Sequence, residues 1–317
     1  MVKLGAFPER THTLSLFART PRRIAFASAL AAAMAGFAAP STASASAAAE
    51  YLYERALMNA ADARCHLFSP EVGHALAAAR VQARNAALRA GDSSTAVEAT
   101  ERRAVDKASG VDCRSRGLAL AAERLRTAFA DYAKLQVMRF PGPQSAWRAE
   151  RPYPDYHGGP RWGLLQAVLG QGGWVLLGTT GGVVTVLDAR PHAAPAASAR
   201  LVMRDPARLA QPYLDPGRRE LAAQAPPPDV SQVFIARSRS TAAKSLLPAG
   251  ASSGTTYQFP TEALSALARL DPREFATLEL VYPGVKGDRI ATAWIEIGDL
   301  AAAEAFLASG HIVKARR

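Results

Sequence analysis

The chain has 317 residues, a formal net charge of +11 and two cysteines. About half of the residues are apolar (49%) and 21% are charged, which excludes a wholly disordered chain and a membrane protein with several spans. This length allows one or two globular domains.

Residues 1–45 have the pattern of a signal peptide. Basic residues at 19–23 precede a weakly apolar run over 24–39, Pro40 ends the run, and small residues alternate after it. The run is shorter than the about 20 apolar residues that a transmembrane helix needs. Arg22 and Arg23 leave open whether export uses the general or the twin-arginine route. The sequence therefore predicts a periplasmic or secreted protein with no transmembrane anchor after cleavage.

Residues 46–139 are predicted to form a helical bundle. Glycines and cap residues divide them into four helical segments, over about 48–64, 69–91, 95–110 and 112–137. Ser69 with Pro70 is expected to open the second helix, and a capping box of Thr95 and Glu98 the third. Apolar residues recur at 4-3-4-3 spacing in the fourth segment, which indicates the core of the bundle, with a groove for a partner or a lipid as the alternative.

Residues 140–160 are rich in proline and glycine and are predicted to be a linker, and 161–317 an α+β domain. Eight β-type runs follow the linker, at 162–169, 174–179, 183–189, 199–204, 231–239, 255–259, 276–282 and 289–297. Two helices are expected among the later runs, one opened by Pro260 to Glu262 and one capped by Asp299. Strands joined mostly by turns predict a mostly antiparallel sheet with a few helices.

Cys65 and Cys113 are predicted to form a disulfide, because an even number of cysteines in an oxidising compartment is usually paired. A zinc site formed by these cysteines with His66 and His74 is the alternative. It lacks the paired Cys-x-x-Cys spacing that is typical of strong zinc motifs. The fold class expected from the whole chain is α+β, with a disulfide-tied helical bundle followed by the sheet domain.

The segment 153–162 gathers side chains that could carry chemistry. Asp155 and His157 lie two residues apart and are weak candidates for an acid–base couple or for metal ligands. A surface loop with packed aromatic residues is the alternative reading. The glycine clusters at 170–174 and 178–182 lack the features of phosphate or dinucleotide loops and are expected to be turns. No residue is assigned to a cofactor or a metal.

Two phrases, at 63–91 and 132–143, resemble exported bacterial proteins of unknown function. The resemblance implies export and a helical module, and it implies no activity. Arginine alternates with acidic residues in the helices, which is typical of a solvated surface, so nucleic-acid binding is not expected. The leading hypothesis is a binding or interaction protein whose partner is an envelope protein or an anionic envelope component. A hydrolase with a site near Asp155 and His157 and a structural envelope protein are the alternatives, and the oligomeric state stays open.

Overall fold

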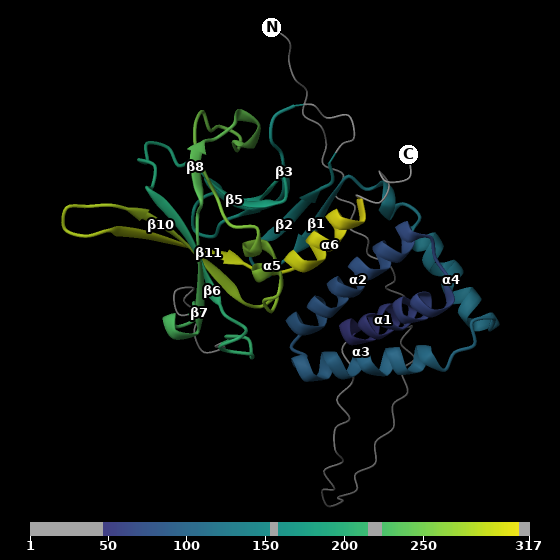
Figure 1. Cartoon of the computed structure of the whole chain (residues 1–317). Coiled ribbons are helices and arrows are strands. Elements are labelled where there is room, and N and C mark those ends of the chain that lie inside the picture. The colour runs from purple at the N-terminus through teal and green to yellow at the C-terminus, as the bar shows by residue number, and fades with distance from the viewer. Residues whose placement is uncertain (1–46, 153–157, 215–223, 311–317) are drawn as a thin grey trace, which may run out of the picture. The chain divides into compact units, whose positions relative to one another are not determined.

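The computed structural model describes residues 47–152, 158–214 and 224–310, and within them it contains helices and two antiparallel β-sheets (Figure 1). The fold is therefore α+β, as the sequence predicts. The described residues belong to one compact unit that spans 44–317. The predicted signal peptide, with its boundary near residue 45, lies outside the described residues.

Four helices form the N-terminal part: α1 (Ala47–Cys65), α2 (Pro70–Arg89), α3 (Ser94–Ser109) and α4 (Arg116–Phe129). α1 packs against both α2 and α3, and α4 contacts α2. Ser69 is the N-cap of α2, as predicted. The predicted capping box of α3 is wrong, because α3 begins earlier and Ser93 Oγ accepts a hydrogen bond from Ala96 N at 3.1 Å.

The fourth helix is shorter than its apolar stripe predicts. Beyond Phe129 the chain forms a short 3-10 helix, η1 (Tyr132–Lys134), and then enters a strand. Arg151 explains the change, because its Nη1 donates to the carbonyl oxygens of Tyr132 and Leu135 at 3.1 and 3.0 Å. These carbonyls thus have partners outside the helix. Burial also raises the pKa of Tyr132 to about 12.

The predicted disulfide is present. Cys65 at the end of α1 is bonded to Cys113 in the loop before α4, with the two Cα atoms 5.5 Å apart. Arg64 Nη2 donates to the Val111 carbonyl beside the disulfide. The bond therefore fixes the α3–α4 loop to the end of α1.

The larger sheet has seven strands, all antiparallel. In spatial order they are β1 (Val137–Pro141), β2 (Ala146–Glu150), β3 (Trp162–Ala167), β4 (Val175–Thr180), β5 (Val183–Asp188), β9 (Thr255–Gln258) and β8 (Ser238–Thr241). Gly181 and Gly182 form the two-residue turn between β4 and β5, with φ of +58° and +82°. Such a turn favours glycine at both positions, so the predicted hairpin turn is confirmed.

The smaller sheet has four antiparallel strands. In spatial order they are β11 (Arg289–Glu296), β10 (Phe275–Tyr282), β6 (Ser198–Arg204) and β7 (Ser231–Ile235). One apolar core joins the inner faces of both sheets with α5 (Glu262–Ala268) and α6 (Leu300–Gly310). Among its buried members are Leu177, Leu201, Leu278 and Phe306.

Two connections join the sheets at their margins. The run 231–239, predicted as one strand, is divided between β7 in one sheet and β8 in the other. Leu169, just after β3, forms an isolated bridge to Trp294 of β11.

The segment 140–160, predicted as a linker, instead contributes the end of β1 and the whole of β2. Whether the helical and sheet parts fold as separate domains stays a prediction.

The start of α6 is held by a buried ion pair. Asp299 is fully buried, and Arg89 of α2 contacts both of its carboxylate oxygens, with Nη2 to Oδ2 at 3.1 Å. Burial raises the pKa of Asp299, and the hydrogen bonds from Arg89 and Asn85 oppose this rise. Asp299 precedes α6 as predicted, and its main-chain oxygen accepts from Ala303 N at 2.9 Å. α6 itself contacts α2 on one side and β1–β3 on the other (Figure 1).

Loss of the disulfide is expected to destabilise the helical part first. In the variant Cys65→Ala/Cys113→Ala, closure of this long loop no longer restricts the unfolded chain, and the expected loss is roughly 4 kcal/mol. All four tryptophans lie at position 147 or later, so their fluorescence reports the sheet part. Far-UV circular dichroism reports mainly the helices.

We expect the helical signal of this variant to be lost at a lower urea concentration than the tryptophan signal. Reduction of the native protein should reproduce the shift. Coincident transitions would contradict the division into separate domains.

Removing the cation of the buried ion pair is expected to cost far more than removing an exposed one. Arg89→Met leaves Asp299 buried without a counter-charge, and the expected loss of unfolding free energy is about 3–5 kcal/mol near neutral pH. Arg102→Met, which removes the exposed contact of Arg102 with Glu98 at 3.7 Å, should have no measurable effect.

The loss caused by Arg89→Met should become smaller as the pH is lowered. A raised pKa means that folded Asp299 holds its proton at a pH where the unfolded carboxyl has lost it. The associated stability is therefore present below the ordinary carboxyl pKa of about 4 and is lost as the pH rises. Urea titrations at several pH values measure the loss of unfolding free energy. A loss that is independent of pH would contradict its assignment to the charge of Asp299.

Candidate functional site

The structure does not test the two candidates that the sequence nominates. Asp155 and His157 fall in 153–157, outside the described residues. Cys65 and Cys113 are joined to each other, so the alternative zinc site lacks its thiolate ligands.

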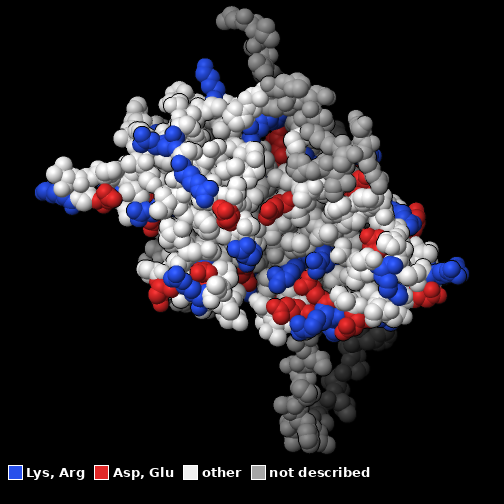
Figure 2. Space-filling view, viewed as in Figure 1, with Lys and Arg blue, Asp and Glu red and all other residues white. Residues whose placement is uncertain are grey.

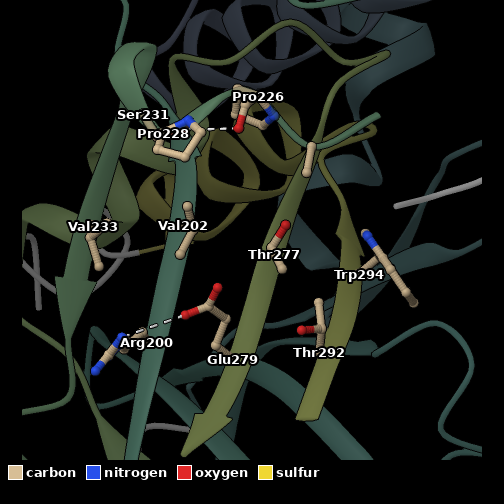
Figure 3. Close-up of a pocket in the computed structure, with 11 residues that line it drawn as sticks. Arg200, Val202, Pro226, Pro228, Ser231, Val233, Thr277, Glu279, Thr292 and Trp294 are labelled. Atoms are coloured by element: carbon tan, nitrogen blue, oxygen red, sulfur yellow. Dashed lines mark hydrogen bonds and ion pairs between the residues drawn. The ribbon is translucent and has the colours of Figure 1, made fainter. Parts of the chain in front are cut away.

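A groove of about 530 Å³ crosses the outer face of the four-stranded sheet, and we call it the outer groove (Figure 3). Its floor consists of outward-facing side chains from four strands, and the turn before β7 forms one wall. The lining residues are Arg200, Val202, Ala225, Pro226, Pro228, Ser231, Val233, Thr277, Glu279, Thr292 and Trp294.

The strand register arranges the floor in two rows. In the first row Val233, Val202, Thr277 and Trp294 are direct cross-strand neighbours from β7 through β6 and β10 to β11. Side chains at such positions lie within contact distance on one face of the sheet. The first row is therefore apolar and aromatic except for one hydroxyl.

The second row runs parallel to the first, and its members in the groove are polar: Arg200, Glu279 and Thr292 in the same strand order. Ile235 of β7 continues this row beyond the residues that line the groove. Arg200 Nη1 lies 3.9 Å from Glu279 Oε2 in a partly exposed ion pair (Figure 3). The opposite charges of these two side chains balance, so the groove carries no net charge of its own on its floor.

The wall of the groove is fixed by one side chain. Ser231 is buried, and its Oγ lies 3.1 Å from the Pro226 carbonyl oxygen and 2.8 Å from that of Pro227, to which it can donate. The prolines supply apolar surface and have restricted backbone angles. The shape of this wall is thus set by local contacts within the chain.

Two polar atoms in the first row have no hydrogen-bond partner. Thr277 is 5% exposed, and its Oγ1 is buried without a partner between Val202 and Trp294. The indole Nε1 of Trp294 is likewise buried and unpartnered. A buried polar group without a partner costs about 1–3 kcal/mol, so such groups are rare in folded proteins.

The lining of the outer groove contains neither histidine nor cysteine, and its serine hydroxyl is directed to carbonyl oxygens of the wall. Elsewhere the charged side chains are mixed: on the face shown in Figure 2, basic and acidic residues lie beside one another. Arg80 and Glu101, whose charged atoms are 2.8 Å apart, are an example from α2 and α3.

The sequence contains part of the signal for this site. In the runs 199–204, 276–282 and 289–297, side chains alternate between the two faces of the sheet. Val202, Thr277 and Trp294 therefore lie on the face that is turned away from the apolar core. The order of the strands in the sheet is not a local property, and this order is what makes the three side chains neighbours.

Comparison with protein-family models, curated protein sequences and solved structures gives no match to this chain.

Proposed function

We propose that this chain is an exported protein of the bacterial envelope that works by binding a ligand in the outer groove. The observation that carries the proposal is the buried Thr277 hydroxyl, which has no hydrogen-bond partner in a groove of about 530 Å³. Ligand sites are concave and mostly apolar, with a few polar groups that set the orientation of the ligand. The outer groove has this composition.

The two rows define the kind of ligand that fits. Val202, Val233 and the indole of Trp294 favour a flat apolar surface. Arg200 and Glu279 next to them favour hydrogen-bonding groups along one edge of the same molecule. Since the two charges are opposite, a neutral or zwitterionic amphipathic ligand fits better than a strongly charged one.

Export is supported by the signal-peptide pattern of residues 1–45 and by the disulfide. Disulfides persist in oxidising compartments, such as the bacterial periplasm and the extracellular space. Among the described residues, no helix combines the length and the apolar character needed to cross a membrane.

The alternatives have less support. The hydrolase hypothesis depends on Asp155 and His157, which lie outside the described residues. A purely structural role does not account for the unpartnered Thr277 hydroxyl. The ligand could be free or be part of an envelope protein or another envelope component.

The indole N–H of Trp294 provides a direct test of binding. In the ¹⁵N-labelled protein this group gives one resonance, which is identified by its loss in Trp294→Phe. A low-molecular-mass extract of the bacterial envelope is expected to shift it. Val202→Phe should abolish the shift by filling the groove, whereas Leu120→Phe, at an exposed position of α4, should preserve it. A shift that survives Val202→Phe would place the ligand elsewhere.

Thr277→Val is expected to stabilise the ligand-free protein by about 1 kcal/mol, because it replaces an unpartnered hydroxyl with a methyl group of similar shape. The same change should weaken the response of Trp294 to the extract. Thr185→Val is the matched control, since the buried Thr185 hydroxyl lies 2.7 Å from Thr180 Oγ1 and can donate to the Val183 carbonyl.

Thermal unfolding should therefore show opposite shifts for the two valine variants. An equal loss of stability in both would mean that Thr277 has a permanent partner such as a bound water, and it would remove the observation on which the groove proposal rests.

Export makes a separate prediction about the N-terminus. N-terminal sequencing or intact mass of the exported protein should show a chain that begins after about residue 45, because small residues at alternating positions there fit signal peptidase. A product that still begins at Met1 would contradict export by this route and would leave the groove proposal untouched.

A further inference from the structure

The turn between β10 and β11 is exposed and carries apolar surface. Pairing of the two strands ends at Tyr282 and Arg289, and the hairpin extends from the rest of the smaller sheet (Figure 1). Residues 283–290 are all exposed, and the side chain of Val285 in the turn is fully accessible. Ile290, just after the turn, is 45% exposed. A single exposed apolar residue is common at a protein surface, so the charges around the turn decide what Val285 can contact.

Two basic side chains belong to this end of the hairpin. Lys286 lies next to Val285 in the turn, and Arg289 begins β11. The guanidinium carbon of Arg289 lies 4.1 Å from the centroid of the Tyr282 ring, a cation–π contact that holds it beside the turn. Among the described residues, neither Lys286 nor Arg289 has an ion-pair partner. Asp288 in the same turn offsets one of the two charges.

Two further arginines lie at the same end of the sheet. Arg237 and Arg239 follow β7, which ends where β6 begins, and both are exposed. Arg239 Nη1 donates to the Ala196 carbonyl at 3.1 Å. The next residue, Ala197, donates its N–H to the Val281 carbonyl of β10 at 2.8 Å. Arg239 therefore lies beside the base of the hairpin.

Ion pairs balance only part of the positive charge here. Arg190 has Asp188 as its partner at 2.6 Å, and Arg200 has Glu279 at 3.9 Å. Within the described chain, the remaining basic residues at this end have no carboxylate partner. We call these four residues the basic end: Arg237, Arg239, Lys286 and Arg289.

We propose that the basic end, with Val285 in its turn, docks on a membrane surface that contains anionic phospholipids. Lysine and arginine side chains are attracted to such a surface over about a Debye length, roughly 8–10 Å. The exposed Val285 side chain can enter the boundary between headgroups and acyl chains. The long stems of Lys286 and Arg289 then keep their charges at the level of the headgroups.

The combination of charge and apolar surface favours a lipid surface over a soluble polyanion. Nucleic acid or polyphosphate offers negative charge but no apolar layer that Val285 could enter. Because the apolar area is small and the basic residues are few, docking is expected to be reversible and to weaken as salt is added. Docking does not use the outer groove, so its test is independent of the ligand proposed there.

Co-sedimentation with lipid vesicles tests the proposal. The native protein is expected to bind vesicles of phosphatidylglycerol and phosphatidylcholine in equal amounts at low salt, and to show no binding to phosphatidylcholine alone. Lys286→Gln should weaken this binding about fivefold, because it removes one charge near the surface. Val285→Ser should weaken it about tenfold at unchanged charge, because it removes apolar area from the contact.

Val105→Ser and Lys107→Gln are the matched controls, since both residues are exposed on α3, and both variants should bind like the native protein. Equal binding to both kinds of vesicle, or to neither, would overturn the proposal. So would hairpin variants that bind as tightly as the native protein, or controls that lose as much binding as the hairpin variants. Binding to soluble polyphosphate that equals binding to the vesicles and is unchanged in Val285→Ser would identify a soluble polyanion as the partner instead, and would overturn it as well.

Discussion

The ion pair between Arg89 and Asp299 determines how the helical part lies on the sheets. A carboxylate without access to water costs several kcal/mol, so α6 can begin in the core only where Arg89 and Asn85 of α2 approach it. α6 in turn places Phe306 against Phe140 and Tyr132, with ring centroids 5.8 and 5.5 Å apart. Arg151 lies over the Phe306 ring at 3.9 Å. One polar contact thus fixes α2, α6 and β1 relative to one another.

The outer groove depends on this arrangement indirectly. α6 and α5 complete the core on the inner side of the sheets, so the outer face of the smaller sheet need not be buried for stability. That face can then hold Thr277 and Trp294 with unpartnered polar atoms. The resulting loss of unfolding free energy is offset by the buried core. The proposed ligand site accounts for such local costs, because a surface that serves binding is not optimised for stability alone.

Local patterns predicted most elements of the fold, and non-local contacts decided the rest. Alternation and turn residues located the strands, and the even cysteine count predicted the bond between Cys65 and Cys113. The interpretation of 140–160 as a linker overlooked β2, because Pro141 and Gly142 resemble a loop although proline is tolerated at the end of an edge strand. The groove could not be predicted, because it joins side chains that only the order β11-β10-β6-β7 brings together.

Residues that contact one another in this fold are far apart along the sequence. This separation affects how the chain can fold while it is being synthesised or passed through a membrane. Arg89 emerges long before Asp299, and β1 and β2 emerge long before the Glu296 and Ile297 carbonyls that accept from Trp147. Contacts between distant parts of a chain form late, because a long loop must close first. An N-terminal portion that has emerged alone therefore holds its disulfide partners and its own small apolar clusters. The larger core and the contact with Asp299 form only when the last two elements of the chain have emerged.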